Sequence, residues 1–86
     1  MLTIDMVIDT YASALKGEPI GGIRLREGTS ETLLIPCSDE WIEVMPTDAG
    51  IRVARGDCVG ETAFTLEPDF ASSVAAIRNL IRTINP

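Results

Sequence analysis

Histidine is missing from this sequence of 86 residues. Histidine is the usual general base and the commonest metal ligand, so its absence removes Ser–His and Cys–His nucleophiles and His-based metal sites together. The glycine-rich stretches at residues 17–22 and 55–60 fit neither of the common phosphate-binding patterns. These absences argue against an enzyme, and we expect the protein to bind no cofactor.

Cysteine is scarce as well, with only Cys37 and Cys58, which do not form a CxxC pair. Without a second pair or a histidine, they cannot complete a zinc site. Asp39 and Glu40 follow Cys37 closely and are expected to raise the pKa of its thiol, which weakens it as a nucleophile. We therefore predict two reduced thiols in a cytoplasmic protein. A disulfide is the alternative if the strands that carry the two residues are adjacent.

Long apolar runs and an excess of basic residues are also absent. No uncharged apolar run approaches the roughly 20 residues that a membrane-spanning helix needs. Asp5 and Asp9 interrupt the N-terminal segment where a signal peptide would be apolar. Seven basic residues against thirteen acidic ones give no electrostatic footprint for nucleic acid. We therefore expect neither a membrane nor a nucleic acid as a direct partner.

What the chain does contain is enough apolar sequence for one globular domain over residues 1–86. Hydrophobic residues make up 45% of the composition, which is too many for a disordered protein. So small a domain cannot bury all of them, and some apolar side chains remain on its surface. Pairing with a second copy of the chain is one way to cover them.

Two segments show the spacing of apolar residues that is typical of helices. Residues 4–16 form the first, with Thr3 as the N-cap and Leu2 placed to pack on Val7. The second follows Pro68, which suits a first helical position. Its apolar seam consists of Phe70, Val74, Ile77, Ile81 and Ile84, with Leu80 beside it.

Between the helices the period changes to two, which is typical of strands. Strands are predicted at residues 23–26, 32–35, 41–45, 51–54 and 63–66, with Pro36 ending the second and residues 46–50 forming a turn. Short turns favour antiparallel pairing of neighbours. The prediction is an α+β fold: a four- or five-stranded antiparallel meander between an N-terminal and a C-terminal helix, both packed on one sheet face. The other face is expected to carry Arg24, Arg26, Leu34, Trp41, Glu43, Met45 and Arg52.

The net charge is confined to one part of the chain. Residues 27–50 contain six acidic residues and no Lys or Arg, so their charge of −6 equals that of the whole protein. The same segment holds the only tryptophan, Trp41. An aromatic anchor beside carboxylates is typical of a binding hot spot, because the ring supplies buried area and the charges steer encounter with a basic surface.

We therefore predict a small acidic protein-binding module, an inhibitor or adaptor that occupies a basic partner such as a nucleic-acid-binding protein. The predicted contact residues are Asp39, Glu40, Trp41, Glu43 and Met45. Phage-encoded inhibitors such as anti-CRISPR proteins share this size and charge, but no motif of theirs occurs here.

Three alternatives stand beside this hypothesis. In the first, Asp39, Glu40 and Glu43 form a catalytic or metal-binding cluster, although a domain this small has little room to bury a carboxylate. In the second, the carboxylates only keep the protein soluble while Trp41 fills the core, and the binding hypothesis then loses most of its support. The third alternative is a structural subunit or chaperone-like homodimer.

Overall fold

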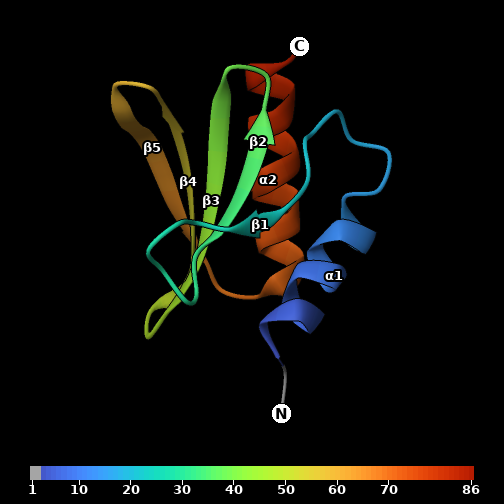
Figure 1. Ribbon diagram of the computed structural model, residues 1–86, viewed down its shortest axis with the longest axis vertical. Coiled ribbons are helices and arrows are strands. Elements are labelled where there is room, and N and C mark those ends of the chain that lie inside the picture. The colour runs from blue at the N-terminus through green and yellow to red at the C-terminus, as the bar shows by residue number, and fades with distance from the viewer. Residues whose placement is uncertain (1–2) are drawn as a thin grey trace.

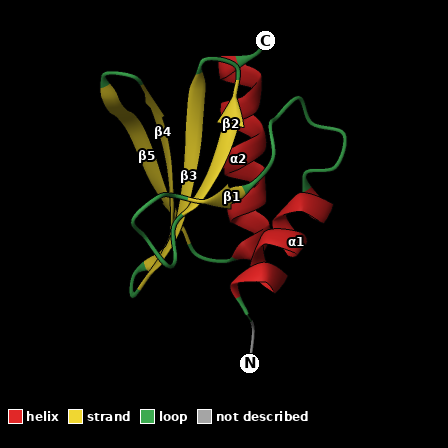
Figure 2. Ribbon diagram, in the orientation of Figure 1, coloured by secondary structure: helices red, strands yellow, loops and turns green. Residues whose placement is uncertain are grey.

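The computed structural model describes residues 3–86 and contains one five-stranded sheet and two helices (Figure 1). Strands that follow one another in sequence are neighbours in the sheet, and every pair is antiparallel. This confirms the predicted meander between two helices, with the fifth strand present (Figure 2). The elements are α1 (Ile4–Ala14), β1 (Arg24–Leu25), β2 (Leu33–Cys37), β3 (Glu40–Thr47), β4 (Gly50–Asp57), β5 (Gly60–Glu67) and α2 (Phe70–Ile84).

The first helix begins as its sequence predicts. The Thr3 side chain accepts a hydrogen bond from the Met6 amide at 3.2 Å, which satisfies one of the free N–H groups of the first turn. The helix ends at Ala14, two residues before the predicted end, and Gly17 then takes a φ of 91° that turns the chain away. The predicted packing of Leu2 on Val7 lies outside the described residues.

The last three hairpins have turns of two residues each, at residues 38–39, 48–49 and 58–59. The strands around them are therefore longer than predicted, and β3, β4 and β5 have eight residues each. Gly50 has a φ of 134°, and a Cβ there would lie 2.6 Å from the Glu67 carbonyl oxygen. Only glycine fits where β4 starts beside the end of β5.

The expectation that Pro36 ends its strand is wrong, because Pro36 pairs with Trp41 inside β2. The Pro36 carbonyl accepts from the Gly21 amide at 2.8 Å, so the backbone of this residue is directed toward the β1 side. The N–H that proline lacks would point to this same side. Few backbone groups are available to pair there, so proline is tolerated at this position. Pro46 likewise lies inside β3, opposite Ile51 and beyond the end of β2.

The second helix starts two residues after Pro68. Asp69 is its N-cap and accepts a hydrogen bond from the Ser72 amide at 2.8 Å, so Phe70 is the first helical residue. The predicted seam is buried at Val74, Ile77 and Ile81, whereas Phe70 remains 38% exposed.

Both helices pack on the same sheet face, as predicted. The core joins one face of β2, β3 and β4 to α2, and α1 and its C-cap contribute Tyr11 and Leu15. The Tyr11 hydroxyl lies 2.7 Å from the Ser73 hydroxyl of α2, and the Tyr11 ring centroid lies 4.8 Å from that of Phe70. The sheet contributes Leu33, Ile35, Ile42, Val44 and Val53, and α2 contributes Val74, Ile77 and Ile81.

The two cysteines are free, and they lie in different environments. Cys37 is buried at the end of β2, and Cys58 is exposed in the turn between β4 and β5. Burial raises the pKa of the Cys37 thiol, and the negative charge of Glu40 raises it further. A protonated thiol is a weak nucleophile. Within residues 3–86, no helix is long and apolar enough to cross a membrane.

Candidate functional site

The helices leave one face of the sheet uncovered, and the candidate site lies there. Side chains alternate along each strand, so residues opposite the buried ones share this face. The strand register places them in rows across β2 to β5. We call this surface the outer face and define it by Leu34, Pro36, Trp41, Glu43, Met45, Arg52, Phe64 and Leu66.

Trp41 belongs to this surface and not to the core. Its indole lies across Gly56 on the neighbouring strand, where an added Cβ would meet three indole atoms at 2.9 Å. The indole N–H donates to a Glu43 carboxylate oxygen at 3.1 Å. The ring is half-buried against the sheet, with its remaining surface open. The condition on which the binding hypothesis rested, an outward Trp41, is therefore met.

Glu43 holds two groups of the outer face together. Besides accepting from Trp41, it forms an ion pair with Arg26 at 3.3 Å. Its side chain is only 14% exposed, so this carboxylate is shielded by its partners. A depression of about 460 Å³ lies beside the indole, between β1 and β3. It is lined by Arg24, Leu25, Arg26, Glu27, Leu34, Trp41 and Glu43.

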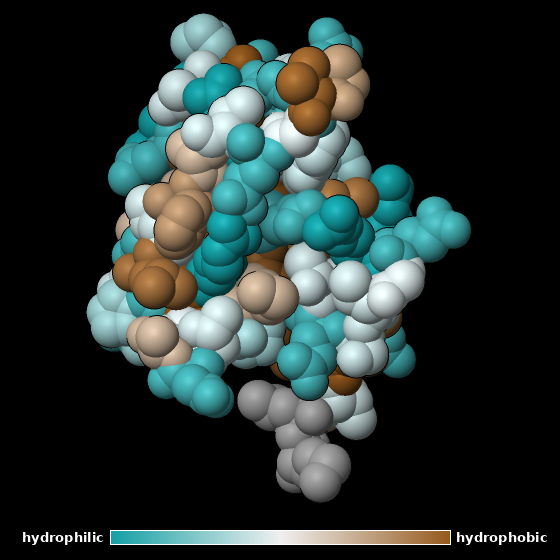
Figure 3. Space-filling view, turned by 90° about the vertical axis from the view of Figure 1, so that its left-hand side faces the viewer, coloured by the Kyte–Doolittle hydropathy of each residue, from teal (hydrophilic) through white to brown (hydrophobic). Residues whose placement is uncertain are grey.

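The β5 side of the outer face is organised around Arg52. The guanidinium lies over the Phe64 ring, 4.3 Å from its centroid, and pairs with Glu61. The hydrogen bond raises the pKa of Arg52 and lowers the pKa of Glu61. Phe64 and Leu66 remain 54% and 49% exposed. Viewed from the β5 side, hydrophobic residues form separate patches among hydrophilic ones (Figure 3).

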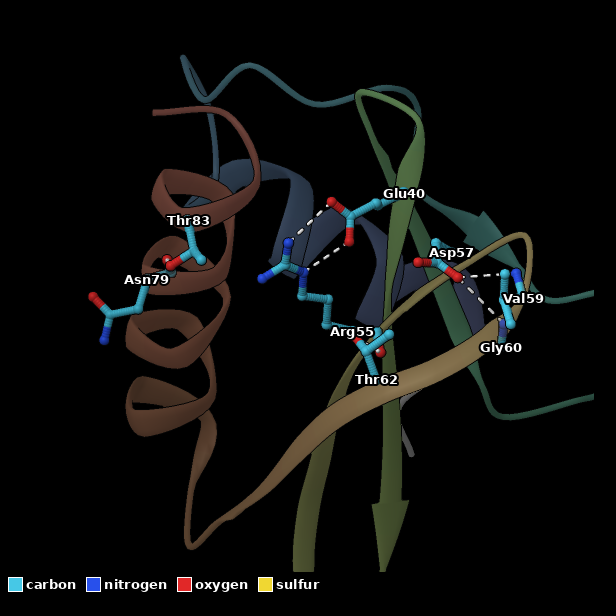
Figure 4. Close-up of polar contacts among 8 residues, drawn as sticks. All are labelled: Glu40, Arg55, Asp57, Val59, Gly60, Thr62, Asn79 and Thr83. Carbon is cyan, nitrogen blue, oxygen red and sulfur yellow. Dashed lines mark hydrogen bonds and ion pairs between the residues drawn. The ribbon is translucent and has the colours of Figure 1, made fainter.

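The predicted contact residues divide into two groups. Trp41, Glu43 and Met45 lie together on the outer face, and Asp39 is exposed in the turn at one end of β3. Glu40 lies on the helix side of the sheet, where Arg55 binds both of its carboxylate oxygens at 2.8 and 3.0 Å (Figure 4). This hydrogen bonding lowers the pKa of Glu40. Glu40 is thus separated from the other four.

Four residues that the sequence analysis does not assign to a site also contribute to this surface: Gly56, Glu61, Phe64 and Leu66. In the sequence, Phe64 and Leu66 alternate with threonines. This alternation indicates two apolar side chains on one face of the last strand, but the position of that strand was needed to place them beside Arg52.

The acidic surplus is located mainly at the ends of the sheet. Within residues 3–86, Glu40 and Glu43 pair with arginines from outside the acidic segment, whereas its other carboxylates form no ion pair. Glu27, Glu31 and Asp48 lie in connections at one end of the meander, and Asp39 lies at the other. Carboxylates therefore flank the outer face more than they cover it.

Comparison with known proteins gives no information on the function of this surface. The chain matches no family model, no curated protein and no solved structure. Among the residues that the structure describes, no three Cys, Asp or Glu side chains come together where they could hold a metal ion.

Proposed function

We propose that this protein is a small acidic protein-binding module, an inhibitor or adaptor, whose outer face occupies a partner protein with a basic surface. The observation that supports this most strongly is the half-buried indole of Trp41, held on an uncovered sheet face by Gly56 and Glu43. A nucleic-acid-binding protein is the favoured partner, because carboxylates can take the place of phosphates in its site.

Trp41 is suited to act as the anchor because its position is set before binding. Immobilising a side chain on association costs roughly 0.5–1.5 kcal/mol, and a ring already held by Glu43 avoids part of that cost. Met45 and Leu34 lie half-buried on the same face and extend the apolar area around the ring. Aromatic anchors with such surroundings dominate the energy of many interfaces.

The flanking carboxylates are suited to steer the encounter. Charges at the rim of an interface act mainly on the association rate, because their field extends beyond contact distance. Glu27, Glu31 and Asp48 at one end and Asp39 at the other would direct the outer face toward a basic patch. The carboxylate of Glu43 is already paired with Arg26 and would contribute through position more than through net charge.

The exposed apolar pair Phe64 and Leu66 also favours a second candidate, a structural homodimer. In that function the outer face would be covered by a second copy of the chain and would be unavailable to other proteins. Sedimentation equilibrium distinguishes the two: a monomer at micromolar concentration supports the binding module. An obligate dimer that protects Trp41 from quenching supports the homodimer.

The test of the proposed function is affinity capture from an extract of the source organism, followed by mass spectrometry. Leu34→Lys/Met45→Lys places two charges on the outer face, and Met6→Lys/Val59→Lys places the same charges at exposed apolar positions elsewhere. We expect the wild type and the second variant to retain one basic partner that the first variant loses. Equal capture by both variants would show that the outer face is not the contact surface.

A further inference from the structure

The two edges of the sheet differ in how much backbone they offer to another chain. At one edge, β1 has only two residues. At the other, β5 has eight residues, and residues 61–66 are all exposed. An edge strand of this length presents N–H and C=O groups that can pair with an added strand. Figure 1 shows β5 at the free side of the sheet.

The register indicates which backbone groups are free. The two-residue turns close on the pairs Thr47↔Gly50 and Asp57↔Gly60, which are hydrogen-bonded positions in such hairpins. Alternation along β4 then makes Arg52↔Leu66 and Ala54↔Phe64 non-hydrogen-bonded pairs. The N–H and C=O groups of Phe64 and Leu66 therefore point away from β4, toward the free edge.

A groove runs beside this edge on the helix side of the sheet. Its volume is about 400 Å³, and small side chains form most of both walls, beside Phe64 and Glu67. We call it the β5 groove and define it by Val53, Ala63, Thr65, Ala75, Ala76 and Leu80. A strand added to β5 would direct alternate side chains into this groove and over the outer face beside Phe64 and Leu66.

We propose that β5 and the β5 groove bind an extended segment of a partner protein as a sixth strand of the sheet. The segment carries an aliphatic side chain that enters the groove and a Lys or Arg that lies against Glu67. Glu67 also lines the groove and forms no ion pair among residues 3–86. The α2 wall of the groove contributes no charged residue. A cation at the Glu67 end would therefore meet an uncompensated carboxylate.

A second copy of this chain fits the same edge less well. β5 has a glutamate near each end, Glu61 and Glu67. The strand contains no Lys or Arg, so the β5 of a second copy would bring no cation to Glu67. Glu61 of that copy would bring only another carboxylate, already paired with Arg52 on the outer face. The charge pattern thus favours a foreign segment with a basic residue.

This site goes beyond the proposed function, because it uses the free backbone edge and the helix side of the sheet. The probe is a phage-displayed library of random heptapeptides, selected on the immobilised full chain. We expect the selected peptides to alternate β-branched and other residues and to carry a basic residue at one end. A selected peptide is then synthesised, and its affinity is measured by fluorescence polarisation.

Two matched pairs of variants locate the binding site. Leu66→Pro and Leu66→Ala both remove the leucine side chain, but only proline also removes the free backbone N–H. We therefore expect Leu66→Pro to bind the peptide about tenfold more weakly than Leu66→Ala. Ala76→Leu fills the groove, whereas Ala71→Leu adds the same side chain at an exposed helix position outside it. We expect only Ala76→Leu to weaken binding. This second pair decides the question if circular dichroism shows that Leu66→Pro does not fold.

Several outcomes would overturn the proposal: no enriched peptide, selected peptides without a basic residue, or equal binding within the interpretable pairs. A dimer in sedimentation that Ala76→Leu dissociates would also overturn it, by assigning the edge to a second copy. Trp41→Ala should leave the peptide affinity within about twofold of the wild type, since Trp41 lies on β3 and does not line the β5 groove. Failure at this edge therefore leaves the outer-face proposal standing, and the reverse also holds.

Discussion

At the scale of single residues, the outer face depends on how one indole ring is held. Trp41 lies flat because Gly56 has no side chain beneath it, and Glu43 fixes the ring's orientation through the indole N–H. Replacing either support should change the position of the ring without changing the core on the other side of the sheet.

We expect Gly56→Ala to displace the indole and to destabilise the protein by about 1–3 kcal/mol, because the new Cβ would lie 2.9 Å from three ring atoms. Tryptophan fluorescence should shift to the red as the ring becomes more exposed, and urea denaturation should report the lost stability. Gly22→Ala is the matched control, since nothing lies within 4 Å of its added Cβ. An unchanged spectrum in Gly56→Ala would contradict the packing of Trp41 on β4.

Glu43 and Glu40 should differ sharply in their effect on the captured partner. Glu43→Ala removes the acceptor of the indole N–H, so we expect partner affinity to fall about tenfold. Glu40→Ala removes a carboxylate on the helix side of the sheet, where Arg55 is its partner, and should change the affinity less than about threefold. Surface plasmon resonance measures both. The reverse order of effects would place the interface on the helix side.

The position of Glu40 differs from the one that the sequence predicts. The predicted strand begins at Trp41, so Glu40 is expected in the connection before it. In the structure Ser38 adopts a φ of 53°, which allows a two-residue turn without glycine and puts Glu40 inside β3. Once Glu40 belongs to the strand, alternation assigns it to the side of Ile42. A positive φ at a serine is uncommon and cannot be predicted from its neighbours.

At the scale of elements, one buried polar contact helps to attach α1 to α2. The Ser73 hydroxyl donates to the Phe70 carbonyl at 2.6 Å, which leaves the Tyr11 hydroxyl to donate to Ser73 at 2.7 Å. Burial raises the pKa of Tyr11, so this group stays protonated and remains a donor. The contact links the two ends of the chain on one side of the sheet.

We expect Tyr11→Phe to cost about 0.5–1.5 kcal/mol, the usual net value of one hydrogen bond. Ser73→Ala should cost about 1–3 kcal/mol, because it leaves the buried tyrosine hydroxyl without an acceptor. Urea denaturation of the two single variants and the double variant measures the coupling. Additive losses, with no coupling between positions 11 and 73, would show that the contact does not attach α1.

The elements themselves were largely predictable from residue patterns, and the errors have a common cause. The switch from a period of 3.6 to a period of 2 predicts the helix–meander–helix order correctly. The sequence predicts that Pro36 ends its strand and that Pro46 begins a turn, yet both lie within strands at positions where the missing N–H would face little or no partner strand. The register of the sheet decides whether the backbone N–H position of a proline faces a neighbouring strand. The local sequence does not contain that information.

At the scale of the whole molecule, three carboxylates make stability depend on acidity. Hydrogen bonds from Arg55, Arg52 and the Ser72 amide lower the pKa values of Glu40, Glu61 and Asp69 in the folded state. A lowered folded-state pKa stabilises the fold above the unfolded pKa, about 4 for Glu and Asp, and this contribution disappears as pH falls through the folded pKa.

The midpoint of urea denaturation should therefore fall as the pH is lowered from 5 toward 2. Because all three groups are solvent-accessible, the effect of each should be small. Asp69→Asn retains a side-chain oxygen that can cap α2 but removes the titrating group, so its stability should fall less steeply with acid. An identical pH profile for Asp69→Asn and the wild type would show that this cap does not contribute to the acid sensitivity.

The confined charge leads to a prediction about rates of association. If the carboxylates at the ends of the sheet steer the partner, the association rate should fall steeply between 50 and 300 mM salt, where the Debye length shortens from about 14 to about 6 Å. Asp39→Lys/Asp48→Lys should flatten this dependence. Asp5→Lys/Asp9→Lys makes the same change in net charge on α1, away from the outer face.

The second pair separates local steering from the effect of total charge. If only total charge mattered, both double variants would give the same salt dependence. If position matters, Asp5→Lys/Asp9→Lys keeps most of the wild-type slope, because α1 packs on the opposite side of the sheet. Stopped-flow measurement of Trp41 fluorescence on mixing with the captured partner follows the association directly, since the indole lies at the proposed contact. Dissociation rates should change little in either variant, because the exchanged side chains lie outside the apolar centre of the outer face.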